Sequence, residues 1–335
     1  MESRFTDKVV VITGATGGVG RATALAFAKE GARVALLARG QEQLAATLSE
    51  IERAGGRGLA VPTDVADAAQ VEAAAERTES ELGPIDIWVN NAMVSVFAPI
   101  KEISPEEFRR VTEVTYLGQV YGTMAALRRM IPRDRGSIIL VGSALAYRGI
   151  PLQSAYCGSK HAIEGFYDSL RCELLHDKSS IKTCMVQLPA MNTTQFGWVL
   201  SRLPRQPRPM GKIYEPEVAA RAILYAATHN KRSIWVGAST YKAIIGNKIS
   251  PSFADWDLAR TGYNGQQTAQ PVSPDRQNNL WQPVSEDRGT HGDFGGKATN
   301  RSLTLWSVKN RGWVAGAAGV AGIAALSGLL LAKRK

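Results

Sequence analysis

The sequence predicts an α/β fold in which short buried parallel strands alternate with helices, and three observations support this. Over residues 1–250, apolar β-branched runs alternate with longer stretches of helical periodicity. A glycine-rich turn joins the first such run to the first helical stretch. Hydrophobic residues make up 44% and charged residues 21% of the 335 residues, close to the globular average, so the composition excludes wholesale disorder.

The first unit of this fold is a strand, a helix and a second strand within about 30 residues. Residues 8–13 are rich in Val and Ile, as a buried parallel strand is. The helical stretch 21–30 follows, Gly31 closes it, and residues 33–37 form the second strand. Such a unit with its glycines in the first turn is the pattern of a dinucleotide-binding site.

Each glycine of the turn has its own physical task. Gly14 permits the tight turn out of the strand, and Gly18 lets the backbone approach a diphosphate. Gly20 lets the helix pack closely against the strand, so that the helix N-terminus faces the phosphates. We therefore expect this turn to bind a dinucleotide.

The end of the second strand predicts which dinucleotide binds. An acidic residue there would hydrogen-bond the ribose 2′-hydroxyl of NAD, but the sequence has Ala38 and Arg39. A guanidinium suits a 2′-phosphate, so NADP(H) is favoured over NAD(H). Arg21 is expected near the same phosphates.

Asp64 and Val65 follow the third predicted strand, residues 58–61, and we expect Asp64 to hydrogen-bond the adenine amino group. An equally good local explanation makes this aspartate the cap of the next helix, residues 66–82. The sequence leaves both interpretations open.

The candidate catalytic residues come after the next two predicted strands, residues 85–89 and 136–141. Ser143 lies at a strand end, and Tyr156 and Lys160 stand four residues apart on one helix. Positions i and i+4 share a helix face, so the ammonium is expected beside the phenol, where it lowers the phenol pKa. That arrangement suits a proton-transfer catalyst.

With these motifs, the chain resembles the short-chain dehydrogenase/reductase family. The resemblance covers about residues 8–237 and rests on Thr-Gly-x3-Gly-x-Gly from Thr13, Asn-Asn-Ala from Asn90, Ser143 and Tyr156-x3-Lys160. It implies a Rossmann-like, doubly wound sheet of about seven mostly parallel strands with helices on both faces. It also implies hydride exchange between a nicotinamide and a carbonyl or alcohol carbon.

The resemblance also implies roles for single residues. Tyr156 is expected to give or take the hydroxyl proton, Lys160 to hold the nicotinamide ribose and tune Tyr156, and Ser143 to orient the substrate oxygen. The expected cofactor contacts come from Gly14, Thr16, Gly18, Val19, Gly20, Arg39, Asp64, Val65, Asn91, Tyr156, Lys160, Pro189 and Thr193.

The sequence departs from the family pattern at three places. Met93 stands where the family has a glycine after Asn-Asn-Ala, and Thr115 stands where it has a catalytic Asn. A Thr hydroxyl still hydrogen-bonds water, so Thr115 is kept as a candidate for the proton relay. Ala190 replaces a glycine in the loop where Pro189 and Thr193 are expected to grip the carboxamide.

Residues 194–214 are expected to form the substrate lid. Phe196 and Trp198 precede a stiff basic run, residues 204–209, which suits a lipophilic substrate that arrives from a membrane surface. A surface loop whose prolines only restrict its entropy explains the same residues equally well. On the first interpretation, the substrate contacts are Ser143, Tyr156, Phe196 and Trp198.

The chain divides into a catalytic and dinucleotide-binding domain (1–250), a polar extension (251–312) and an apolar tail (313–335). The extension shows no useful periodicity and reads as a linker or a partly ordered segment. We expect part of it to dock on the domain, because it contains the aromatic residues Trp256, Tyr263, Trp281 and Phe294.

The tail predicts membrane attachment. Residues 314–332 are 19 uncharged residues, which as a helix span roughly 28 Å, about the thickness of a bilayer core. A buried helix is the alternative, but it would show more of a polar face. Residues 1–8 are polar, so no signal peptide is predicted, and the domain is expected to face the cytosol, where NADP(H) is supplied.

The formal charge of +10 does not indicate nucleic-acid binding, because no Lys/Arg block exceeds three residues and no helix carries a basic stripe with aromatic residues. The three cysteines match neither a secreted disulfide framework nor a zinc motif: Cys157, Cys172 and Cys184. We expect mostly buried, reduced thiols and no metal site.

The sequence therefore predicts a membrane-attached, NADP(H)-dependent oxidoreductase that acts on a small carbonyl or alcohol; its assembly, a homodimer or a homotetramer, is left open. The alternative is a non-catalytic NADP(H)-binding scaffold or sensor, which Met93 and Thr115 motivate. The intact Ser143, Tyr156 and Lys160 argue against that alternative.

Overall fold

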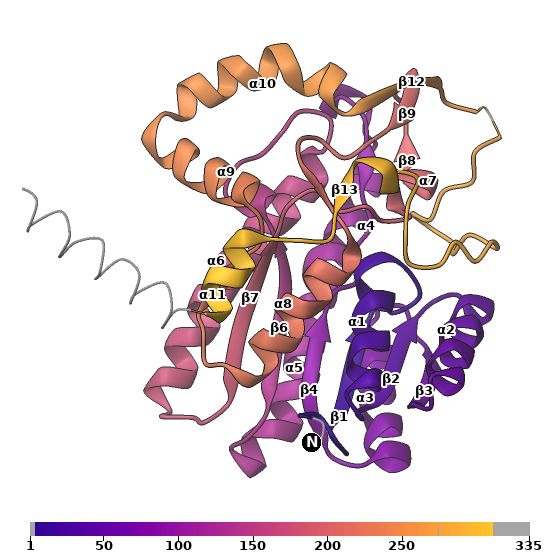
Figure 1. The fold of residues 1–335 in the computed structure, drawn as a ribbon, viewed down its shortest axis with the longest axis vertical. Coiled ribbons are helices and arrows are strands. Elements are labelled where there is room, and N and C mark those ends of the chain that lie inside the picture. Colours follow the sequence, from indigo (N-terminus) through magenta and orange to yellow (C-terminus); the bar gives the residue numbers. More distant parts are fainter. Residues whose placement is uncertain (1–3, 274, 311–335) are drawn as a thin grey trace, which may run out of the picture.

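Residues 4–273 and 275–310 are described by the computed structural model, and they form helical layers around one central sheet (Figure 1). The predicted α/β, doubly wound fold is confirmed. All seven strands of the sheet are parallel. In their order across the sheet they are β3 (Arg57–Pro62), β2 (Arg33–Ala38), β1 (Val9–Thr13), β4 (Ile85–Asn90), β6 (Ser137–Ser143), β7 (Lys182–Leu188) and β11 (Ser233–Trp235).

Strand β1 shows why the sheet is buried on both faces. Val10 and Ile12 belong to one apolar cluster, and Val9 and Val11 belong to a second cluster on the opposite face. Side chains alternate across a strand, so an unbroken β-branched run fills both layers. Helices α1 (Gly18–Lys29), α2 (Gln41–Arg53) and α8 (Pro216–Thr228) cover the first cluster, and α3 (Ala68–Leu82), α4 (Pro105–Thr112), α5 (Gly118–Met130) and α6 (Ser154–His176) cover the second.

The strand order reverses between β1 and β4. Connections from β1 lead to one side of the sheet and connections from β4 lead to the other, so the loops after these two strands diverge. In an open α/β sheet, this divergence leaves a crevice at the carboxyl ends of the strands. Residues 14–17 follow β1 and residues 91–95 follow β4, so both loops border that crevice.

The lid, residues 194–214, follows β7 and contains only short elements. The first of them is α7 (Gln195–Trp198), and the lid is joined to the domain where β8 pairs with β5. The short strands are β5 (Val96–Phe97), β8 (Leu200–Ser201), β9 (Arg205–Pro207) and β10 (Ile213–Tyr214). The short helical turns elsewhere are η1 (Ile100–Glu102), the π-helical η2 (Glu113–Leu117), η3 (Ile131–Arg133), η4 (Ala144–Ala146) and η5 (Gly295–Lys297).

Residues 251–310 pack along the domain, although the sequence predicted no regular element there. One strand of this part pairs with β9 of the lid and another pairs with β10. The stretch 276–294 contacts residues at the carboxyl ends of the sheet strands and is called the strap below. The regular elements of this part are α10 (Pro251–Gly265), β12 (Gln267–Pro271), β13 (Ala298–Thr299) and α11 (Leu303–Lys309), and α9 (Ala238–Ile249) precedes it.

Aromatic residues contribute less to this docking than the sequence predicted. Trp256, Tyr263 and Trp281 are 51%, 46% and 47% exposed, whereas Leu280 of the strap is fully buried. Phe294 does dock, since its ring lies edge-on to Phe196 of the lid at 5.8 Å. Many of the other strap contacts use its backbone carbonyl groups, which no residue pattern reveals.

Within residues 4–273 and 275–310, no helix is both long enough and apolar enough to cross a bilayer. The predicted membrane tail, residues 313–335, lies outside the described residues.

Candidate active site

A cavity of about 400 Å³ lies at the carboxyl ends of the sheet strands. Each of six strands contributes lining residues at or just after its end, so residues from six separate parts of the chain meet in one space. The strand-end residues are Gly14, Arg39, Asp64, Asn91, Ser143 and Pro189.

The glycine-rich loop forms one wall of the cavity. Gly14 and Gly18 have φ angles of 65° and 50°, a backbone conformation that favours glycine. A Cβ atom on Gly20 would lie 2.0 Å from the carbonyl oxygen of Gly14, so no side chain fits there. Helix α1 begins at Gly18, and its N-cap, Gly17, offers no side-chain hydrogen bond. The free N–H groups of this first turn are suited to bind an anion.

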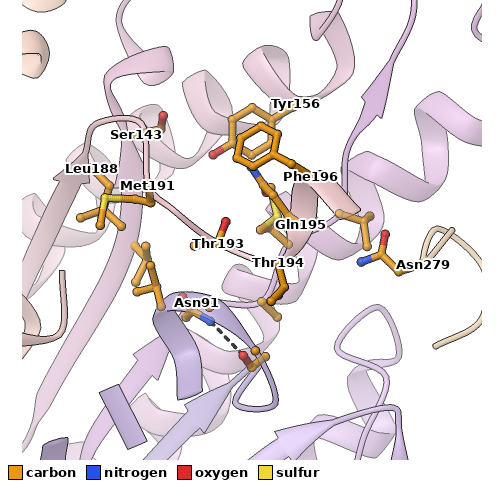
Figure 2. A pocket seen from close by; sticks show the side chains of 18 of the residues that line it. Asn91, Ser143, Tyr156, Leu188, Met191, Thr193, Thr194, Gln195, Phe196 and Asn279 are labelled. Carbon is orange, nitrogen blue, oxygen red and sulfur yellow. Dashed lines mark hydrogen bonds between the residues drawn. The ribbon is translucent and has the colours of Figure 1, made fainter. Parts of the chain in front are cut away.

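The side chain of Asn91 supports this loop. Its amide donates to the carbonyl oxygens of Thr13 and Gly14 at 3.0 and 3.2 Å, and a dashed line from Asn91 in Figure 2 marks a hydrogen bond of this side chain. The Thr13 hydroxyl in turn accepts from the backbone N–H groups of Asn91 and Ala92. Asn91 therefore fixes the loop while it lines the cavity, and Met93 lines the cavity beside it.

The start of the lid lies against the glycine-rich loop. A Cβ on Gly17 would lie 3.1 Å from the Trp198 ring, and a Cβ on Gly18 would lie 2.9 Å from Thr193. Thr194 lines the cavity here, and its hydroxyl is buried and has no hydrogen-bond partner among the described residues. A buried hydroxyl without a partner is costly. Together with the free N–H groups of α1, it fits the diphosphate of a dinucleotide.

Arg39 lines the end of the cavity that borders the strap, and its side chain contacts the strap. Its guanidinium donates to the backbone carbonyls of Asn279 at 2.5 Å, Trp281 at 2.9 Å and Leu280 at 3.4 Å. These contacts involve Nη1 and Nη2, and the Nε has no hydrogen bond to the described residues. Since a guanidinium carries five N–H donors, the side of Arg39 that includes Nε keeps donors for a phosphate.

Asp64 lies at the same end and is paired. Its carboxylate contacts the Arg110 guanidinium at 2.5 Å and accepts from the backbone N–H of Ala66. The N-cap of α3 is Asp67, whose side chain accepts from the N–H groups of Ala69 and Gln70, so the cap interpretation of Asp64 was wrong. Since Arg110 balances the charge of Asp64, Arg39 makes this end of the cavity positive.

Arg21 does not lie where the sequence placed it. Its buried guanidinium pairs with Glu50 at 2.9 Å and with Asp287 of the strap at 2.5 Å. It is absent from the cavity lining. Arg21 therefore anchors the strap to helices α1 and α2, and its charge is already balanced.

Helix α6 brings Tyr156 to the cavity, on the same side as Ser143 (Figure 2). The Ser143 oxygen accepts from the backbone N–H of Leu145 at 3.1 Å, which leaves its own O–H free to donate. Burial raises the pKa of Tyr156 well above its usual value, and a hydrogen bond from Ser143 acts in the opposite direction. The phenol is therefore protonated at neutral pH.

Lys160 lies one helical turn after Tyr156, with Nζ 5.6 Å from the centre of the phenol ring. The amine donates to the carbonyl oxygen of Val141 at 2.7 Å. Burial lowers the pKa of Lys160 to about 7. The sequence predicted that Lys160 lowers the Tyr156 pKa, whereas in the folded chain burial is the largest influence on both groups and favours the neutral form of each.

The structure does not bring Thr115 to this cluster. Thr115 is fully buried in η2, and its hydroxyl donates to the carbonyl of Val94 at 2.9 Å and accepts from the Val94 N–H at 3.1 Å. It is absent from the cavity lining. Because Val94 engages both its donor and an acceptor site, the relay predicted for Thr115 has no geometric support.

All other predicted site residues except Gly20 line the cavity. Gly20 lies behind the lining residues and lets helix α1 approach Gly14 closely. Eight polar lining residues were missed, because nothing in their local sequence distinguishes them from surface residues: Gln43, Thr63, Gln153, Thr194, Gln195, Arg208, Ser239 and Asn279. The end of the cavity beside Tyr156 is mostly apolar, with Leu145, Ile150, Phe196 and Met210 among its lining residues.

The comparisons with known proteins agree with this geometry. Residues 8–201 match the family described as short chain dehydrogenase. A Bacillus subtilis protein named uncharacterized oxidoreductase YxnA is 32% identical over 326 residues, which cover 96% of this chain and 90% of that protein.

Two solved structures share the fold. A short-chain dehydrogenase/reductase from Mycobacterium marinum superposes with a TM-score of 0.61 at 27% identity, over 70% of this chain and 95% of that one. A metagenomic short-chain oxidoreductase in complex with NADP gives a TM-score of 0.59 at 26% identity, over 69% and 96% of the two chains.

Proposed function

Because the chain belongs to the short-chain dehydrogenase/reductase family, and is therefore an oxidoreductase that interconverts CH–OH and C=O groups with NAD(P), we propose that it uses NADP(H) on a lipophilic substrate. The observation that carries the proposal is the position of Ser143, Tyr156 and Lys160 in the same cavity as the glycine-rich loop.

The chain's residues fit such a cofactor along the length of the cavity. The N–H groups at the start of α1 and the Thr194 hydroxyl would hold the diphosphate. The side of Arg39 that includes Nε would hold a 2′-phosphate. Lys160 would hold the nicotinamide ribose, and Pro189 and Thr193 would border the carboxamide. When bound, the nicotinamide supplies or accepts the hydride.

Tyr156 moves the proton in this proposal. In carbonyl reduction, the neutral phenol donates its proton to the substrate oxygen, and in alcohol oxidation the phenolate accepts it. The Ser143 O–H, held by Leu145, donates a hydrogen bond to the same oxygen and orients it. The apolar lining beside Tyr156 excludes water and favours a lipophilic substrate.

The direct test is a panel of lipophilic ketones and aldehydes with purified protein, with NADPH consumption as the readout. We expect NADPH to bind, seen as a change in its fluorescence, and at least one carbonyl compound to be reduced. A protein that binds neither NADPH nor NADH would contradict the proposal.

Arg39 should select the cofactor. In Arg39→Ala, NADPH affinity should fall about tenfold or more while NADH affinity changes little, because a charge-assisted contact to the 2′-phosphate is lost. Fluorescence titration of both cofactors measures this difference.

The strap contacts of Arg39 require a control. Gln43 also holds the strap, through bonds to the Val284 and Ser285 carbonyls at 2.8 and 2.9 Å, so Gln43→Ala loosens the strap and keeps the guanidinium. Gln43→Ala should leave the ratio of NADPH to NADH affinity unchanged. Equal weakening of both cofactors in Arg39→Ala would show that Arg39 only holds the strap.

Membrane attachment is proposed on the tail sequence alone. Residues 314–332 carry no charge, and the catalytic domain would face the cytosol, the source of NADP(H). Full-length protein should stay in the membrane pellet in alkaline carbonate, while a chain cut after residue 312 should be released with unchanged turnover. Full-length protein in the carbonate supernatant would rule out a membrane-spanning anchor.

A further inference from the structure

Among the described residues, the substrate end of the cavity contains one cation besides the catalytic Lys160, namely Arg208, and no acid. Five titratable side chains line the whole cavity: Arg39, Asp64, Tyr156, Lys160 and Arg208. The first two lie at the strap end, and Lys160 is bonded to Val141. Arg208 is half-buried, and its only side-chain hydrogen bond within the described residues is a long one, 3.5 Å, from Nε to the carbonyl of Pro209.

The backbone contacts of Arg208 place it near the catalytic helix. Its N–H donates to the carbonyl of Gln266 at 2.9 Å, and the Gln266 side chain accepts from Gln153 at 2.7 Å. Gln153 is the N-cap of α6, three residues before Tyr156, and it lines the cavity as well. Arg208 is therefore held beside the space in which a substrate would meet Tyr156.

Ser239 also lines the cavity and carries a polar group without a hydrogen-bond partner among the described residues. Ser239 lies in the first turn of α9, which packs against η4 just after Ser143. Its hydroxyl is buried and has no hydrogen-bond partner among the described residues. Because a buried hydroxyl normally has a hydrogen-bond partner, we expect a bound molecule to supply one for Ser239.

The charge of the lid points to the same kind of ligand. Residues 194–214 contain four cations and no Asp or Glu: Arg202, Arg205, Arg208 and Lys212. Only Arg202 is paired with an acid among the described residues, through Glu107 at 2.6 Å. A positive lid over an apolar cavity attracts anions and disfavours cations.

We propose that Arg208 is a specificity-determining residue that receives a carboxylate on an otherwise apolar substrate. One guanidinium with a hydroxyl matches a single negative charge, whereas a phosphate dianion calls for more cations than this end provides. The inference rests on the proposed function, because it assigns a substrate class to the same cavity.

Binding of octanoate and of 1-octanol to the full chain, with and without NADP⁺, tests this proposal without turnover. The wild type should bind octanoate about ten- to a hundredfold more tightly than octanol. Arg208→Leu should abolish that preference, and Arg208→Lys, which keeps the charge, should retain part of it. The control Arg205→Leu should keep it fully, because exposed Arg205 does not line the cavity.

Two results would overturn the inference: a wild type that shows no preference for octanoate, or an Arg208→Leu variant that keeps it. Failure of the proposed function looks different, because a protein that binds no NADP(H) contradicts that function whatever its preference for octanoate. Oxo acids of the same length, compared with their methyl esters, then extend the test to turnover. There, Arg208→Leu should lower kcat/KM much more for the acids than for the esters.

Discussion

Replacing Tyr156 with Phe is expected to lower turnover by about 10²–10⁴-fold, because the group that transfers the proton is lost while the ring remains. NADPH affinity should stay nearly constant, since the phenol oxygen is a minor part of the cofactor contacts proposed above. Steady-state rates on any compound that the wild type reduces, together with fluorescence titration of NADPH, measure both effects. A variant with the wild-type rate would remove Tyr156 from the proposed mechanism.

Tyr167→Phe is the matched control on the same helix. The Tyr167 hydroxyl donates to the carbonyl of Arg232 at 2.6 Å and does not line the cavity. Its loss should lower the free energy of unfolding by about 1 kcal/mol while turnover per folded molecule stays the same. The comparison separates loss of the proton donor from general destabilisation.

The pH dependence of the wild type should differ between the two directions of reaction. Because burial raises the Tyr156 pKa, the phenol stays protonated through neutral pH. Carbonyl reduction needs that proton, so titration of Tyr156 should not lower its rate between pH 6 and about pH 9. A pH dependence near pH 7 in this direction is expected from Lys160 instead, because burial lowers its pKa to about 7. Alcohol oxidation needs the phenolate and should rise with pH across the same range. Oxidation that falls as pH rises would contradict this assignment.

Gly20→Ala should disrupt cofactor binding more severely than any loop substitution at the surface. The new Cβ would lie 2.0 Å from the Gly14 carbonyl oxygen and 2.6 Å from the Asn91 amide nitrogen, so the loop has to move. We expect about 1–3 kcal/mol of lost stability and a loss of turnover on the order of 100-fold. Urea unfolding and NADPH titration measure these effects.

Gly165→Ala provides the control for that substitution. Gly165 lies inside α6, and a Cβ there meets nothing within 4 Å. The change should stabilise the protein by about 0.5–1 kcal/mol through helix propensity, with turnover unchanged. If Gly20→Ala also keeps normal NADPH affinity, close packing of α1 on the loop is not required for binding.

The fold and the centre of the candidate site follow from local patterns in the sequence. Unbroken β-branched runs marked the buried strands, and the i, i+4 spacing placed Tyr156 and Lys160 on one helix face. These features depend on chain geometry over a few residues, which a sequence states directly. Ser143 belongs with them, because parallel strands end at the same edge of a sheet and so bring it to the glycine-rich loop.

The tertiary structure decided which polar side chains are engaged by groups far along the chain. Arg39 looked free in the sequence, yet its guanidinium meets the Trp281 carbonyl, 242 residues away. Thr115 looked available for a proton relay, yet Val94 engages its hydroxyl. Whether a polar group is free or engaged depends on which atoms the fold places beside it.

The strap shows the physical reason most clearly. Its carbonyl groups hold Arg39, Gln43 and Arg110, and every residue type carries the same carbonyl, so no residue pattern marks this contact. The sequence by itself determined the α/β sheet, the glycine-rich loop and the Tyr–Lys helix, because these are set by local periodicity and sterics. Only the fold determined which donors the strap engages. It also determined that the Thr194 and Ser239 hydroxyls are buried without a partner among the described residues, and that Arg208 lines the cavity.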